Sequence, residues 1–237
     1  MPRLWLVLVF ALPSLAGAAD YTIVRRTTID GGTPQEQTEY WGRKRLVVDD
    51  THQRYTVDFG KQQVTAIDKD ERTYWTLPLD RVVRQLLAIG AAVDALPEPA
   101  REMLGLTRRV SVSPTGNTST IAARQAKEYA LGGDGVRGFV WLAEDIDPGT
   151  LLGDEAAAWW RGGGPLRAVG PLEDVAQAIG QQKIRGMPVW VSLTATSESR
   201  STTVDSQVTA IREEPPPPDI ERLPDGLRRV QPPLPGE

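Results

Sequence analysis

The sequence predicts an α+β fold in which a curved, incomplete antiparallel β-barrel (a half-barrel) wraps around one amphipathic helix, with short helices covering it. Residues 52–59 alternate between apolar and polar, with Tyr55, Val57 and Phe59 on one face, as in a sheet that is covered on one side. Residues 79–93 instead repeat apolar side chains at helical spacing. Many strands interrupted by a few helices are typical of α+β domains.

Strands are expected in two groups, each separated by turns rich in Gly, Asp and other polar residues. The first group comprises residues 21–28, 45–48, 52–59, 63–67 and 72–77. The second group comprises residues 107–112, 118–122, 126–131, 136–144, 187–196 and 202–212, of which the last two form a hairpin.

Helices are expected between these groups. The principal one spans residues 79–93 and should bury Val82, Val83, Leu86 and Leu87 against the concave face of the sheet. Pro78 fits the first turn of this helix, where the missing N–H costs little. Shorter helices are expected at residues 100–104, 148–161 and 172–179.

The first 19 residues have the pattern of a cleavable secretory signal peptide. Arg3 precedes an apolar run over residues 4–12, and small residues follow at 16–19. The run is too short to cross a bilayer, which takes about 20 apolar residues. We therefore expect a mature protein in the periplasm, or outside the cell, with a domain at 20–213 and a Pro-rich tail at 214–237.

Composition narrows the classes of function. The 237 residues carry a formal net charge of −4 and no polybasic run, which argues against nucleic acid and anionic membrane surfaces as partners. No residue is a cysteine, so the chain has no disulfides, thiolate metal ligands or thiol nucleophiles. No segment after the N-terminal run is long and apolar enough to span a membrane.

Several short motifs resemble a family of exported bacterial proteins of unknown function, which are thought to share the fold of the outer-membrane lipoprotein carrier proteins. The matching segments are residues 40–46, 64–68, 69–74, 121–129, 140–143, 184–189 and 223–227. The resemblance implies an incomplete antiparallel barrel closed by helices, with a cavity for a hydrophobic ligand. It implies no catalytic residues, and the functional analogy rests on the fold alone.

Catalytic chemistry has weak support in the sequence. His52 is the one histidine, so a metal site or a Ser-His-Asp triad would have to be built around it, and no serine lies in a nucleophile-elbow pattern. Paired carboxylates for glycoside hydrolysis occur only beside turns and loops. These acidic pairs and clusters are Asp68 with Asp70, Glu144 with Asp145 and Asp147, and Asp154 with Glu155.

Aromatic and apolar residues are the stronger candidates for a binding site. Trp159 and Trp160 lie beside the triglycine at 162–164, and two adjacent rings about 100° apart on a helix cannot both face the core easily. The predicted ligand-binding set is Tyr55, Val57, Phe59, Val83, Leu86, Leu87, Trp141, Trp159 and Trp160. No metal or cofactor is expected.

These observations predict a non-enzymatic periplasmic protein that binds an apolar ligand, a lipid or a lipoprotein acyl chain. The alternative is an envelope interaction or assembly factor whose core is filled and whose Pro-rich tail and exposed faces contact partners. A hydrolase that uses paired carboxylates has the least support.

Overall fold

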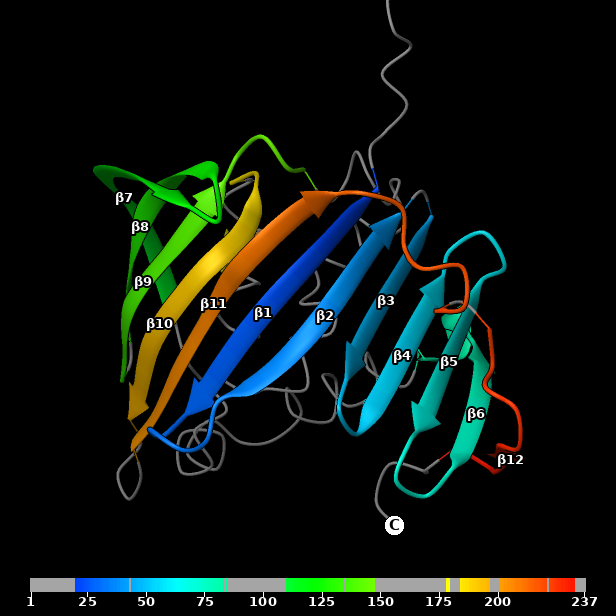
Figure 1. The fold of residues 1–237 in the computed structure, drawn as a ribbon. Coiled ribbons are helices and arrows are strands. Elements are labelled where there is room, and N and C mark those ends of the chain that lie inside the picture. The colour runs from blue at the N-terminus through cyan, green and yellow to red at the C-terminus, as the bar shows by residue number, and fades with distance from the viewer. Residues whose placement is uncertain are drawn as a thin grey trace, which may run out of the picture.

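The computed structural model describes residues 20–42, 44–82, 84, 110–133, 135–147, 178–179, 184–196, 201–220 and 222–232. Over these residues the chain forms one open, curved sheet of twelve strands in the order β12-β6-β5-β4-β3-β2-β1-β11-β10-β9-β8-β7 (Figure 1). Two meanders of consecutive antiparallel strands make up the sheet, and β1 joins them by pairing with β11.

The first meander contains β1 to β6, which span Tyr21–Ile29, Gln35–Gly42, Arg45–Asp50, Gln53–Asp58, Gln63–Asp68 and Thr73–Pro78. The second contains β7 to β11, which span Val110–Ile121, Arg124–Gly133, Val136–Ala143, Met187–Thr196 and Ser201–Glu213. The two-residue strand β12, Arg228–Arg229, adds to the edge of β6 in parallel.

The predicted fold class is wrong. Strands dominate the described residues and form one open sheet, rather than an α+β half-barrel wrapped around a helix. Of the predicted helix at 79–93, only residues 79–82 and 84 are described; they are helical, and Leu79 is buried while Val82 is partly buried against the same core. The helical period of residues 79–93 indicates one local element; it does not determine how the strands pair, and they form one continuous sheet.

Most predicted strands are confirmed, with two differences. Residues 110–112 and 118–121, expected in two separate strands, are parts of one strand, β7, which continues through Pro114 because its pairing with β8 shifts register between Pro114 and Thr118. Proline tolerates such an irregularity because its missing N–H is then not needed for the ladder. β2 and β12 were not predicted.

One side of the first meander carries a row of buried apolar side chains. Cross-strand partners on adjacent strands point to the same side of a sheet, so the register places six buried side chains in line. This core row consists of Tyr21, Trp41, Leu46, Val57, Val64 and Leu77. We call its side of the sheet the inner face, and the opposite side the outer face.

A second apolar cluster lies in the other meander. Its largest fully buried members come from β9, β10 and β11 and include Leu142, Leu193 and Val204. Ala178, which is also buried, belongs to it, and Ile179 and Ile184 pack against it. The twelve strands therefore form one continuous sheet but fill two separate hydrophobic clusters.

The segment after β11 returns to the sheet. Ile220 is buried, and its carbonyl accepts a hydrogen bond from Arg54 on β4 at 3.2 Å. Arg228 and Val230 then donate backbone N–H bonds to Arg72 and Tyr74 at the edge of the sheet. This arrangement covers the edge of β6, where unpaired backbone groups would otherwise be exposed.

Candidate functional site

A second row on the inner face is only partly covered. Its cross-strand partners are Val48, Tyr55, Ala66 and Trp75, one from each of β3 to β6, and we call them the aromatic row. Val48 and Trp75 are partly buried against the core, Ala66 is buried, and Tyr55 is 41% exposed. The small Ala66 side chain thus lies between two aromatic residues beside a closed core.

The hydroxyl of Tyr55 faces polar surroundings while its ring lies on the apolar row. It donates a hydrogen bond to Gln53 Oε1 at 2.7 Å. Partial burial, and then the charges of Asp50 and Asp68, raise the pKa of Tyr55, so the hydroxyl stays neutral near pH 7. Tyr55 therefore presents an apolar ring with a neutral hydroxyl at its tip, whose proton is donated to Gln53.

The other predicted ligand-binding residues divide into two groups. Val57, Phe59 and Trp141 are buried and belong to the same hydrophobic cluster. The indole N–H of Trp141 is buried with no hydrogen-bond partner among the described residues. Val83, Leu86, Leu87, Trp159 and Trp160 lie outside the described residues.

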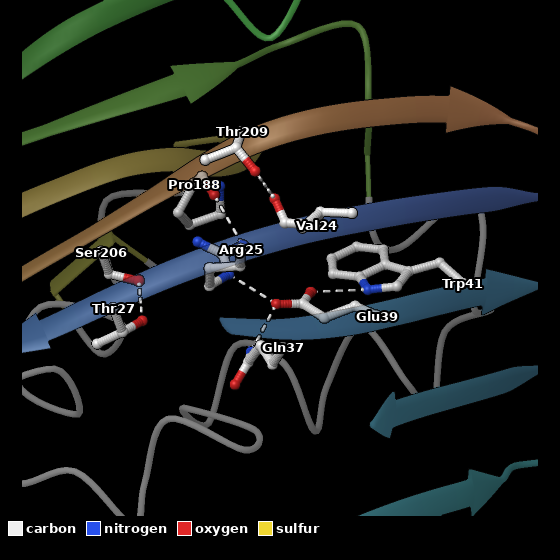
Figure 2. Close-up of polar contacts among 9 residues, drawn as sticks. All are labelled: Val24, Arg25, Thr27, Gln37, Glu39, Trp41, Pro188, Ser206 and Thr209. Carbon is white, nitrogen blue, oxygen red and sulfur yellow. Dashed lines mark hydrogen bonds and ion pairs between the residues drawn. The ribbon is translucent and has the colours of Figure 1, made fainter. Parts of the chain in front are cut away.

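A buried ion pair lies next to the core row, and sequence reasoning missed it. Arg25 Nε on β1 donates to Glu39 Oε1 on β2 at 2.6 Å, with both side chains less than a tenth exposed (Figure 2). Trp41 Nε1 donates to the other carboxylate oxygen at 3.0 Å, and Gln37 Nε2 donates to Oε1 at 2.9 Å. The carboxylate therefore has three donors, which a buried charge requires.

Arg25 also joins the two meanders. Its Nη2 reaches across β11 to the carbonyl of Pro188 on β10, at 3.1 Å (Figure 2). The β9–β10 ladder is irregular between Pro188 and Trp190, and the β1–β11 ladder is irregular at Val24 and Arg25. Thr209 Oγ1 donates to the Val24 carbonyl at 3.3 Å. Side chains thus bind carbonyls where two bulges interrupt the ladders.

The outer face of the first meander carries a cavity of about 400 Å³. Its floor comes from β3 to β6, with Thr56, Thr65 and Thr76 as aligned cross-strand partners. The segment after β11 supplies Arg222 and Leu223 to the lining, and β12 supplies Arg229. We call this cavity the outer groove. A cavity of this volume is in the size range of small-molecule sites.

The lining of the outer groove is strongly basic for an acidic chain. Five cationic side chains line it, against the single carboxylate of Asp58. Burial alone would raise the pKa of Asp58, but hydrogen bonds from the Lys61 backbone and the Arg45 side chain hold it below its usual value. The carboxylate is therefore ionised at neutral pH and bound at 2.8 Å by Arg45.

Over the described residues, the histidine and several of the carboxylates singled out from the sequence lie in separate ion pairs. His52 Nδ1 lies 2.7 Å from Asp70 Oδ2, and both side chains are exposed. Among the described residues, no group of three or more His, Asp or Glu side chains could hold a metal ion. Glu144 pairs with Lys127, and Asp145 shares Arg124 with Glu213. These carboxylates form ion pairs with lysine and arginine side chains at the surface. Asp154 and Glu155 lie outside the described residues.

Within the described part of the chain, no helix has the length and apolarity to cross a membrane. No family model matches the sequence, and no match was found among curated proteins.

Solved structures share a distant likeness of fold. An uncharacterized conserved protein from Thermus thermophilus is 6% identical, with a TM-score of 0.44 and 90% of each chain covered. PNGF-II is 10% identical, with a TM-score of 0.40; the match covers 90% of this chain and only 31% of PNGF-II. MucB is 11% identical, with a TM-score of 0.40, and the match covers 89% of this chain and 59% of MucB. These values assign no family.

Proposed function

We propose that this chain is a non-enzymatic binding protein of the bacterial periplasm, exported by its signal peptide, and that its ligand is apolar: a lipid or a lipoprotein acyl chain. The observation that carries the proposal is the aromatic row. It exposes Tyr55 beside a closed core, and the small Ala66 lies between Tyr55 and Trp75. An exposed aromatic at the edge of a packed apolar face is a site where further apolar surface can be buried.

Acyl-chain burial supplies enough free energy for such binding. Each buried methylene contributes roughly 0.8 kcal/mol, so about ten to twelve methylenes outweigh the cost of ordering the chain. No charged group is needed at the inner face, and the charges that it does bury, Arg25 and Glu39, are already paired with each other. The neutral hydroxyl of Tyr55 donates its proton to Gln53, so its oxygen can accept a hydrogen bond from a polar end of the ligand.

The alternative, an envelope interaction or assembly factor with a filled core, has one observation in its favour. Trp41 and Leu46 in the core row are 0% and 1% exposed, so this part of the inner face is packed as an interior. The two functions differ in a direct way: an assembly factor binds no apolar small molecule at the aromatic row.

The test is a fluorescence titration with an uncharged pyrene-labelled long-chain alcohol, which the cationic outer groove cannot attract. Tyr55→Ala should weaken binding roughly tenfold, about 1.4 kcal/mol, because the aromatic contact is lost. Ile29→Ala is the matched control, since Ile29 is 44% exposed and lies at the far end of β1. Absence of binding by the wild type, or equal weakening by both variants, would contradict the apolar-ligand function.

A further inference from the structure

The outer groove has features that the binding of an apolar ligand at the inner face does not use. The aligned Thr56, Thr65 and Thr76 that line it are strand positions adjacent to Tyr55, Ala66 and Trp75, so they point to the opposite side of the sheet. A ligand of the outer groove would therefore bind independently of the aromatic row.

Two of its cations have no counter-ion among the described residues. Arg45 is paired with Asp58, and Arg54 donates to Asp49 at 2.8 Å. Arg222 and Arg229 form no ion pair with any described residue, although both line the same groove. Two such guanidinium groups in one concave site favour a ligand with two negative charges, because each fork can bind two oxygens of a planar or tetrahedral anion.

Neutral donors and apolar groups complete the lining. The hydroxyls of Thr56 and Tyr74 and the amide of Gln63 are available to phosphate oxygens in the same groove. Ile67 is buried in the floor, and Leu223 is 46% exposed at the C-terminal wall. A leucine exposed next to two arginines suits a ligand that joins an anionic group to a small apolar one.

We infer that the outer groove binds a small organic phosphate, a phosphomonoester with an apolar substituent, between Arg222 and Arg229. The dianionic phosphate matches these two guanidinium groups in charge. The volume of about 400 Å³ fits a single small molecule. The segment after β11 forms the site together with β3 to β6, so the return of this segment to the sheet creates the groove.

The test is an isothermal titration of the full chain with phenyl phosphate at low salt, with phenyl sulfate and inorganic phosphate as comparison ligands. Phenyl phosphate should bind with a Kd below about 1 mM, and the monoanionic sulfate should bind at least several-fold more weakly. Binding should weaken as salt is raised, because the exposed arginines are screened. Equal affinity for inorganic phosphate would remove the apolar part of the proposal.

Two double variants distinguish phenyl phosphate binding in the outer groove from attraction by arginine charges elsewhere on the surface. Arg222→Ala/Arg229→Ala should weaken phenyl phosphate binding tenfold or more. The matched control is Arg26→Ala/Arg137→Ala, which removes the same net charge at two exposed strand positions outside the groove. If the control weakens binding as much as the groove variant, or if phenyl phosphate does not bind the wild type, the proposal is overturned.

A measurement on the wild type avoids dependence on the variants. Backbone amide chemical shifts recorded during the phenyl phosphate titration should change at Thr56, Thr65 and Thr76 and at the residues after β11. Shifts confined to residues away from the groove would also overturn the proposal. The uncharged alcohol used for the aromatic row should leave phenyl phosphate affinity unchanged, so failure of one site and failure of the other are distinguishable.

Discussion

Glu39→Ala is expected to destabilise the protein by about 3–5 kcal/mol, because it leaves the Arg25 guanidinium buried without its carboxylate. Trp41 and Gln37 lose their acceptor in the same substitution. Arg25→Met/Glu39→Met, which removes both charges, should recover a substantial part of the loss, because no isolated charge then stays buried. Urea unfolding of the three proteins measures these free energies.

The chain contains a matched control for this prediction. Arg212 Nε and Glu214 Oε1 are also 2.6 Å apart, but their side chains are 56% and 47% exposed, against 8% and 6% for Arg25 and Glu39. Glu214→Ala should therefore change stability by less than about 1 kcal/mol. If Glu39→Ala proves as mild as Glu214→Ala, the Arg25–Glu39 pair is not buried as the structure has it.

Gly138→Ala is expected to cost about 2–4 kcal/mol, because it forces two strands of the second meander apart. A Cβ at residue 138 would lie 2.1 Å from the carbonyl oxygen of Ser192 and 2.7 Å from Cα of Leu193, both of them backbone atoms that cannot rotate away. The φ of +154° adds strain for any residue other than glycine. Thermal or urea unfolding gives the loss.

Gly31→Ala separates crowding from backbone strain. Gly31 also has a positive φ, +68°, but a Cβ there would meet no atom within 4 Å. The loss should be about 1 kcal/mol, the cost of the left-handed conformation alone. Equal losses at the two glycines would mean that β9 and β10 do not approach each other as closely as the structure has them.

The strands were predictable from sequence where one face is apolar and the other polar. β4 and β5 show this clearly, since Val57 and Val64 are core partners and Thr56 and Thr65 face the other way. β2 was not predicted because Gln37 and Glu39 precede Trp41 on its inner face, and this polar sequence is typical of a loop. Only the pairing of β1 with β2 brings Glu39 to Arg25, and no local pattern encodes this contact.

The candidate site was partly predictable for the same reason. Alternation placed Tyr55 and Val57 on one face, but could not distinguish an exposed position from a buried one on that face. The outer groove was not predicted, because its arginines come from β3, β4 and residues 222–229, which are distant in sequence. The tail carried no periodic signal, and its return to β6 depends on two backbone hydrogen bonds, from Arg228 and Val230.

Native mass spectrometry of the protein purified from the bacterial envelope tests the apolar-ligand function most directly. We predict a population heavier than the chain that starts near residue 20, with a mass excess of one lipid that organic extraction removes, and a smaller excess in Tyr55→Ala than in Ile29→Ala. A single species of the bare mature mass, for the wild type and both variants, would contradict the proposed function.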